Sequence, residues 1–451
     1  MDVIKYIIKY INYPLAMRLT GQYGRVKVYR RFVRNQYRPY AENINERDKR
    51  LYKIVMYAIK NVPFYHDFAK KNKLSFTVET ITEDIKSLPI MTKEIIRKEG
   101  KRLYSKEKVK FHTETSGGST GEPVQLRHDD NLSGLISGEY FLSYAGYDIG
   151  DKVAVLWGSE RDILAGSIGL KAKVVNRLVK RRRFLNSFMM DDETMRTYVK
   201  IINKWKPKVI LAYVQSIFEL AKFIEKEGLE VYSPGGGIVV SAGTLFQDWK
   251  QLIEKVFRCP VINQYGSRET PAIAISCKQN DELHVNTFIN YVEIVDEMDQ
   301  PLLDGEDGEI IVTNLYNKSM PLIRYRIGDI GALSSKKQCK CKRSLPKLKY
   351  VKGRTVNIFK RRDGAKIDGE YFTHLFYGID SVKKFQVIQE DYEHIKIKME
   401  LDRKLKKEAV QKMTDSIKAV MGKSCEVEYE FVDKLAPTSS GKYLYTISKV
   451  D

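Results

Sequence analysis

A run of glycines and hydroxyl residues is the first place in this chain where residue types suggest chemistry. Residues 115–123 contain three glycines and four Ser or Thr side chains, and no apolar side chain precedes Pro123. Glycine permits tight turns and exposes backbone N–H groups, and hydroxyls add further donors, so such a loop can wrap a polyphosphate. The loop lacks the Lys of the G-x-x-x-x-G-K-[ST] type, and a surface linker is the alternative interpretation.

Four more polar motifs follow along the chain. They are Tyr-Gly-Ser-Arg-Glu at 265–269, Arg-Tyr-Arg-Ile-Gly-Asp at 324–329, Gly-Arg at 353–354 and Pro-Thr-Ser-Ser-Gly-Lys at 437–442. Each is weak alone, but five in this order resemble the adenylate-forming enzymes, the superfamily of acyl-coenzyme A ligases. The similarity is greatest to the phenylacetate–coenzyme A ligase branch and its capsular-polysaccharide, CapK-type members.

The reaction that this resemblance implies joins a carboxylate to the α-phosphate of ATP and expels pyrophosphate. An anion attacks a polyanion, so the enzyme needs donors directed at phosphate, a divalent cation and a cation near the attacked phosphorus. By resemblance, Glu269 binds Mg²⁺ and Lys442 is the catalytic cation. Asp329 accepts both ribose hydroxyls, which suits a carboxylate because it is only an acceptor. The alternatives are a capping Glu, a turn Asp and a solvated Lys.

The same resemblance assigns the remaining nucleotide contacts. The β- and γ-phosphates are assigned to Thr115, Ser116, Gly117, Gly118, Ser119, Thr120 and Gly121. Asn263 and Tyr265 face adenine across a slot from Ser241, Ala242 and Gly243, although Tyr265 has a core aromatic as its alternative. The other cofactor-binding candidates are Gln264, Gly266, Ser267, Arg268 and Arg354.

This chain departs from the family pattern at three places. Gly117 replaces a second hydroxyl residue, and Arg268 replaces the Thr that contacts the α-phosphate in many members. An Arg can supply a charge-assisted contact instead. Val356 and Asn357 follow the Gly-Arg hinge, where relatives carry acidic residues, so the rotation of the lid about this hinge is in question.

A second constellation consists of thiols and one imidazole. Cys277 and His284 lie seven residues apart, and the Cys-x-Cys pair Cys339 and Cys341 follows about 60 residues later. Three thiolates and one imidazole complete a closed tetrahedral shell, so the set predicts a structural Zn²⁺ site. Scattered reduced cysteines beside a surface His are the alternative.

The pattern of strands and helices predicts the elements that position these residues. Helices are expected at 47–71, 216–226, 246–257 and 403–421, and strands at 153–157, 208–212, 237–241, 261–264, 291–295, 309–314, 383–389, 394–401 and 424–432. Their alternation predicts an α/β fold: a large domain of mostly parallel sheets flanked by helices with a β-rich section, and a small α+β lid. We expect an adenylation domain at 1–352, with a helical N-terminal segment, and a mobile lid at 353–451.

Composition limits location and partners. The formal charge of +21 favours anionic partners. The densest basic cluster consists of Lys171, Lys173, Arg177, Lys180, Arg181, Arg182 and Arg183. It is interpreted either as a solvated face or as a docking site for an acidic polysaccharide precursor or anionic lipid. No nucleic-acid motif accompanies it.

The N-terminus and the cysteines bear on the compartment. Five cysteines fit a reducing cytoplasm, and no long apolar run predicts a membrane span. The first 20 residues do not match a signal peptide. They predict a helix packed on its own domain, or an amphipathic helix at the inner membrane face with Ile4, Ile7, Ile8 and Ile11 on one side.

Two hypotheses for function follow. One is an ATP-dependent ligase that makes an acyl-adenylate and transfers the acyl group to coenzyme A, or to an amine or hydroxyl, in surface polysaccharide biosynthesis. The other is a ligase-like binding protein that docks to an acidic polymer or membrane. Retention of Glu269, Asp329 and Lys442 together favours the enzyme. Trp157, Phe188 and Tyr213 are candidates for the substrate pocket.

Overall fold

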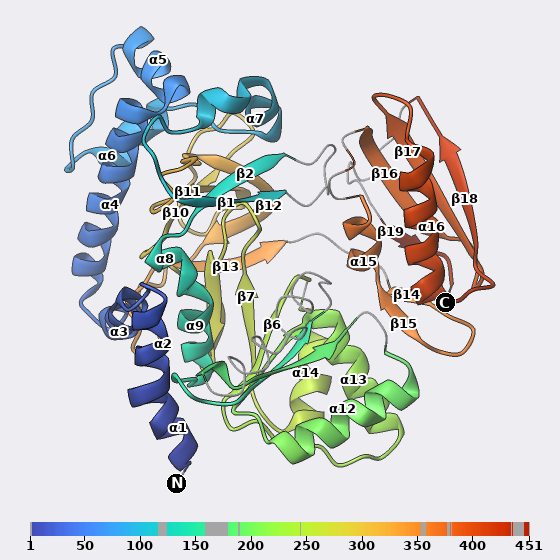
Figure 1. Cartoon of the computed structure of the whole chain (residues 1–451). Helices are drawn as coiled ribbons and strands as arrows, with labels where there is room; N and C mark the ends of the chain where they lie inside the picture. The colour runs from blue at the N-terminus through green and yellow to red at the C-terminus, as the bar shows by residue number, and fades with distance from the viewer. Residues whose placement is uncertain are drawn as a thin grey trace. The chain divides into compact units, whose positions relative to one another are not determined.

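The structure is a computed structural model that describes residues 2–450, except 116–123, 158–178, 188–189, 244, 353–357, 377–378, 380, 434 and 436–445. The chain forms two compact units (Figure 1). The first unit contains Met1–Glu114, Val124–Gly150 and Ile262–Gly353, and the second contains Thr115–Pro123, Asp151–Val261 and Arg354–Asp451.

The first unit begins with helices. They are α1 (Val3–Ile7), a π-helical turn (Ile8–Asn12), α2 (Tyr13–Leu19), α3 (Gly24–Asn35), α4 (Tyr40–Asn61), α5 (Pro63–Lys71), α6 (Ile81–Asp84), α7 (Lys93–Glu99), α8 (Leu132–Leu135) and α9 (Ser137–Leu142). The single helix expected at 47–71 is wrong, because two helices meet there. Val62 is extended with φ −113° and ψ 117°, since Pro63 disfavours the helical conformation in the residue before it.

The strands of the first unit form an antiparallel array in the order β10-β11-β12-β13-β9-β8-β7. Their bounds are β7 (Val261–Tyr265), β8 (Ala274–Cys277), β9 (Asn280–Val285), β10 (Asn290–Val295), β11 (Gly308–Asn314), β12 (Tyr325–Leu333) and β13 (Lys347–Lys352). β1 (Phe111–Thr115) pairs with β2 (Gln125–Asp129). Apolar residues of α4, β10, β11 and β12 share one core, which includes Leu51, Val55, Ile294, Val312 and Tyr325.

The second unit contains the parallel strands that the alternating pattern predicts. β4 (Arg182–Asn186), β3 (Val153–Trp157), β5 (Val209–Tyr213) and β6 (Gly237–Ser241) pair in that order, all parallel. The helices α12 (Asp192–Trp205), α13 (Val214–Lys226) and α14 (Gln247–Phe257) bury apolar faces in the same core as these strands. Strand-to-strand connections through helices account for the parallel pairing.

The C-terminal part is a small α+β region. β18 (Glu426–Phe431), β17 (His394–Leu401), β16 (Val382–Gln389) and β19 (Thr446–Ser448) form one sheet in that order, with α15 (Gly369–His374) and α16 (Lys407–Met421). β14 (Ile358–Lys360) and β15 (Lys366–Asp368) make a separate hairpin. The mixed α/β fold class, with a β-containing C-terminal domain, is therefore confirmed. The boundary expected at residue 353 lies outside the described residues and stays a prediction.

Candidate functional site

Two segments of the first unit exchange tyrosine–carboxylate hydrogen bonds. The Tyr265 hydroxyl, at the end of β7, donates to Asp329 Oδ2 of β12 at 2.7 Å. The Tyr325 hydroxyl, at the start of β12, donates to Glu269 Oε1 after β7 at 3.3 Å. We call these four residues the crossed pair. It joins the two segments that carry the carboxylates that the resemblance assigns to ribose and to Mg²⁺.

A tight turn after β7 directs Glu269 inward. A Cβ on Gly266 would lie 2.8 Å from the Ala272 backbone nitrogen, so only glycine fits there without a shift. The Ser267 N–H donates to the Thr270 carbonyl at 3.1 Å, and the Thr270 N–H donates to Ser267 Oγ at 3.1 Å. These bonds close the turn, and Glu269 is buried within it.

A bulge in β12 positions Asp329. β11 and β12 pair at Ile311 with Arg326 and at Glu309 with Ile330, so three residues of β12 stand opposite one of β11. Gly328 has φ +88°, a conformation that glycine adopts without strain. Bulges redirect side chains at the ends of strands, and here the bulge presents Asp329 to Tyr265.

A lysine that the motifs did not reveal completes the surroundings of Glu269. Lys93 Nζ lies 3.6 Å from Glu269 Oε1, and both side chains are largely buried. Lys93 is the first residue of α7, whose N-cap Thr92 accepts the Ile95 N–H at 3.3 Å. Met91, two residues earlier, forms backbone hydrogen bonds of 2.8 and 3.0 Å with the residues flanking Tyr325. This backbone pairing explains why Lys93, although distant in the chain, reaches the crossed pair.

The first Arg of the Arg-Tyr-Arg motif has a structural role. Arg324 is buried, with φ +52°, and its guanidinium donates to the carbonyls of Lys86 and Leu88 at 2.9 Å each. Its Nε lies 3.3 Å from Glu293 Oε1. Burial raises the pKa of Glu293, and Arg324 opposes that shift. Arg324 therefore fixes the loop before α7 against the start of β12.

Two histidines on the β1–β2 hairpin lie near the crossed pair and were missed by sequence reasoning. The rings of His112 and His128 are 5.8 Å apart. His128 is buried, and within the described part of the chain its Nε2 has no hydrogen-bond partner. Burial lowers the pKa of His128, whereas the charges of Glu114 and Glu269 act in the opposite direction. In the sequence, only the alternation of apolar residues in β2 could have indicated that His128 is buried.

The other nucleotide candidates are distributed over the two units. Asn263, Gln264, Gly266, Ser267 and Arg268 belong to the first unit with the crossed pair, and the Asn263 N–H donates to Ser276 Oγ at 2.8 Å. Ser241 ends β6 in the second unit and is followed by Ala242 and Gly243, and Thr115 ends β1. Ser116, Gly117, Gly118, Ser119, Thr120, Gly121, Arg354 and Lys442 lie outside the described residues.

The four Cys and His candidates converge. Their ligand atoms all lie within 4.8 Å of one another. Cys277 Sγ is 3.7 Å from Cys339 Sγ, and Cys341 Sγ is 3.4 Å from His284 Nε2. Metal–ligand lengths of about 2.3 Å for sulfur and 2.0 Å for nitrogen give tetrahedral edges of about 3.8 and 3.5 Å. The observed separations match those edges and are far longer than a disulfide bond of about 2 Å.

Hydrogen bonding at this cluster already favours a thiolate. A hydrogen bond from Cys277, followed by one from His284, lowers the pKa of Cys341. The same bond with Cys341, together with burial, raises the pKa of Cys277. His284 is fully buried on β9, between Ile275 of β8 and Lys347 of β13, so the sheet positions it before any ion binds.

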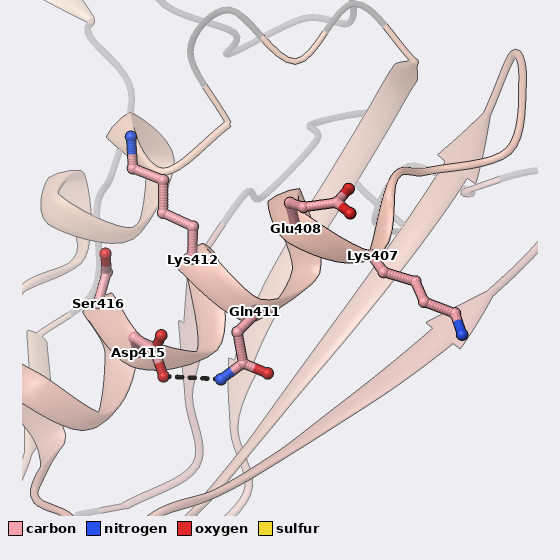
Figure 2. A pocket seen from close by; sticks show the side chains of 6 residues that line it. All are labelled: Lys407, Glu408, Gln411, Lys412, Asp415 and Ser416. Carbon is pink, nitrogen blue, oxygen red and sulfur yellow. Dashed lines mark hydrogen bonds between the residues drawn. The ribbon is translucent and has the colours of Figure 1, made fainter.

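Three further features give weaker site candidates. A hollow of about 550 Å³ lies beside α16, and its lining residues within the described part of the chain all belong to that helix (Figure 2): Lys407, Glu408, Gln411, Lys412, Asp415 and Ser416. The rings of Trp157 and Tyr213 lie 4.0 Å apart, whereas Phe188 is outside the described residues. Arg181 of the basic cluster is buried, so the described part of this cluster is not wholly a solvated face. Residues 171–178 of the cluster are not described.

Comparison with known proteins bears on the family. Residues 359–449 match the family model of the CapK C-terminal domain. Over 400 residues the chain is 28% identical to protein CapK of Staphylococcus aureus, with 87% of this chain and 86% of that protein covered. A phenylacetate–coenzyme A ligase of Pseudomonas putida is 23% identical over 422 residues, covering 87% of this chain and 91% of that protein. The chain is therefore similar to CapK and, more distantly, to the phenylacetate–coenzyme A ligases.

Solved structures agree with the fold of this CapK relative. A 2-hydroxyisobutyryl-CoA ligase, in complex with 2-HIB-AMP and CoA in its thioesterification state, aligns with a TM-score of 0.60 at 19% identity, covering 92% of each chain. An open conformation of that ligase aligns with a TM-score of 0.58 over 91% of this chain and 92% of that one. At this identity the likeness shows the fold alone. The resemblance inferred from the five motifs is confirmed.

Proposed function

We propose that this protein is an ATP-dependent, adenylate-forming ligase that activates a carboxylic acid as its acyl-AMP. The crossed pair is the observation that supports the proposal, because its hydrogen bonds join the two segments that carry the proposed ribose acceptor, Asp329, and the proposed Mg²⁺ ligand, Glu269. Tyr265 orients Asp329 at 2.7 Å, and Tyr325 orients Glu269 at 3.3 Å. Ligases among the relatives, and a similar fold bound to an acyl-AMP, support the same reaction.

Different residues would offset the negative charge of ATP and of the attacking carboxylate. Mg²⁺ held by Glu269 would neutralise phosphate charge, and Lys93 holds that carboxylate in place. Asp329 would bind both hydroxyls of the ribose. Lys442 would then supply the cation at the attacked α-phosphate, with the glycine-rich loop on the β- and γ-phosphates. Arg268 would replace the usual Thr contact with a charge-assisted one.

We assign the second half-reaction to transfer of the acyl group to coenzyme A or to an amine or hydroxyl. A role in surface polysaccharide biosynthesis is supported by the CapK relative. We place the lid boundary at 353, which is supported by the start of the CapK C-terminal family match at residue 359. No described helix is both long and apolar enough to cross a bilayer, and we propose a cytoplasmic location.

We also propose that Cys277, His284, Cys339 and Cys341 hold one structural Zn²⁺. Four ligands fill the shell and leave no position for substrate, so the ion would stabilise the fold and take no part in the reaction. It would join the end of β8 to the loop between β12 and β13. That array carries the crossed pair on β7 and β12.

Pyrophosphate release tests the proposed reaction. The purified chain is mixed with ATP, Mg²⁺ and a panel of carboxylic acids, and release is followed for each acid. We expect release that depends on one class of acid and is lost in Glu269→Gln, while Lys407→Gln on α16 serves as a matched surface control. Release with no acid in a broad panel, alongside binding to acidic polymers, would instead support the ligase-like binding protein.

A further inference from the structure

An exposed apolar stripe runs along the N-terminal helices of the first unit. Ile4, Ile7, Ile11 and Leu15 recur every three or four residues, and each leaves between 43% and 58% of its surface exposed. The neighbouring exposed apolar residues are Val3, Tyr6, Tyr10 and Leu19. We call these eight residues the N-terminal stripe. Soluble proteins normally bury such a helical face against a core.

The opposite side of the same helices is packed on the unit. Ile8, Tyr13 and Met17 are buried, so the expectation that Ile8 shares a side with Ile4, Ile7 and Ile11 is wrong. A π-helical turn follows, from Ile8 to Asn12.

Two contacts fix the orientation of the stripe. Lys9 forms an ion pair with Asp148. A Cβ on Gly150, whose φ is +94°, would lie 2.7 Å from the Lys5 carbonyl oxygen, so the helix backbone lies directly against this loop. The helices are therefore held on their buried side while the N-terminal stripe faces outward.

The N-terminal segment that carries the stripe is rich in basic residues. Residues 2–41 contain nine Lys or Arg and one acidic residue, Asp2. At the end of α2 the Arg18 guanidinium lies 4.7 Å from the Tyr23 ring, and Lys27 of α3 lies 5.9 Å from the same ring. The exposed basic residues of α3 are Lys27, Arg30, Arg31 and Arg34.

We propose that the N-terminal stripe lies on the surface of an anionic lipid bilayer, with its apolar side chains among the acyl chains and the surrounding cations at the headgroups. A helix with an apolar face and basic flanks lies in the interface in this way. The 17 residues of Val3–Leu19 span about 25 Å, which suits lying on a bilayer and is short for crossing it. A second copy of the chain would bring two basic surfaces together, so charge complementarity favours the lipid. The inference is independent of the proposed adenylation.

The chain contains a matched control for exposed apolar surface. Met298 and Leu303 are each 76% exposed, but the turn that carries them is acidic, with Asp296, Glu297 and Asp299 beside Met298. If apolar exposure alone caused binding, this turn would bind as well. The proposal requires the combination of apolar and basic residues that the N-terminal stripe has and this turn lacks.

Co-sedimentation of the full chain with vesicles tests the proposal. Vesicles are made of phosphatidylcholine alone, or of phosphatidylcholine with phosphatidylglycerol at 7:3. We expect the parent to bind the anionic vesicles and to bind phosphatidylcholine weakly. Ile7→Gln with Ile11→Gln should weaken binding by about tenfold or more, because two exposed isoleucines no longer enter the acyl region. Met298→Gln with Leu303→Gln should bind like the parent.

A second measurement locates the stripe relative to the lipid. Leu15→Trp should show fluorescence quenching by brominated acyl chains, and Leu303→Trp should not. The proposal is overturned if the parent fails to bind anionic vesicles, if the double Ile variant binds as the parent does, or if Leu15→Trp is not quenched. A lipid-free dimer that the double Ile variant abolishes would assign the stripe to a second copy and would also overturn it.

Discussion

Removal of two thiols should reveal whether the Cys and His cluster holds zinc. We predict that Cys339→Ser with Cys341→Ser lowers zinc content from about one ion per chain to near zero and lowers thermal stability. The ion would join Cys277 to Cys339, which are 62 residues apart. In the chain-entropy treatment of a cross-link, a loop of that length stabilises the folded state by about 4 kcal/mol.

That free energy corresponds to a measurable shift in melting temperature. For a unit of about 150–250 residues, 1 kcal/mol shifts the melting temperature by roughly 2–4 °C, so we expect a decrease of roughly 8–16 °C. The assay is elemental analysis of protein purified without chelator, combined with calorimetry. A strong chelator should reproduce the decrease in the parent and leave the double Ser variant unchanged.

Cys259→Ala provides the control, because Cys259 is buried in the second unit and outside the cluster. It should retain full zinc content. The reasoning is refuted if the parent contains no zinc and the three thiols and one imidazole of the cluster react freely in the native state. It is also refuted if the double Ser variant keeps the metal, since two ligands cannot hold it in a closed tetrahedral site.

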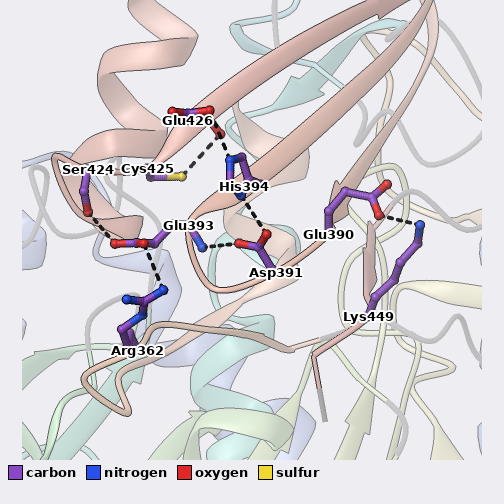
Figure 3. Close-up of polar contacts among 9 residues, drawn as sticks. All are labelled: Arg362, Glu390, Asp391, Glu393, His394, Ser424, Cys425, Glu426 and Lys449. Carbon is purple, nitrogen blue, oxygen red and sulfur yellow. Dashed lines mark hydrogen bonds and ion pairs between the residues drawn. The ribbon is translucent and has the colours of Figure 1, made fainter.

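Three other predictions concern the proposed reaction and one surface histidine. Asp329→Ala should weaken AMP binding by roughly tenfold or more, because hydrogen bonds to a charged acceptor contribute about 1.5–3 kcal/mol. Tyr265→Phe should weaken AMP binding less. If calorimetry shows the same AMP affinity for the parent and both variants, Asp329 does not belong to the site. Lys442→Ala should slow pyrophosphate release by about 100-fold or more with little change in ATP affinity, since it acts on charge that develops in the transition state; an unchanged rate would remove that role. In the C-terminal sheet, His394 lies between Asp391 at 2.7 Å and Glu426 at 3.1 Å (Figure 3), and Asp391 first, then Glu426, raises its pKa. Its stabilising interaction should be complete below about pH 6.5 and be lost as the pH rises through the raised value, and an NMR titration should show the pKa falling in Asp391→Asn.

The sequence by itself determined the resemblance to adenylate-forming enzymes, the order of the motifs and most regular elements. Strands at 237–241 and 394–401 have the expected bounds, because hydrophobic patterning and flanking turns are local properties of the chain. Helix boundaries were less accurate: the helix expected from residue 403 begins at Lys407, and the long helix breaks at Val62. Cys277, His284, Cys339 and Cys341 could be named as one set because their types, unlike their positions, already suggest a metal.

Tertiary structure alone decided which of these residues meet. Lys93 reaches Glu269 only because the segment before α7 pairs with β12. Tyr265 reaches Asp329 only because a bulge redirects three residues of β12. The outward side of the N-terminal stripe likewise depends on the burial of Ile8, Tyr13 and Met17 and on the approach of Gly150. Contacts between residues distant in the chain depend on strand register and backbone irregularities, which pairing in three dimensions sets and local residue patterns do not encode.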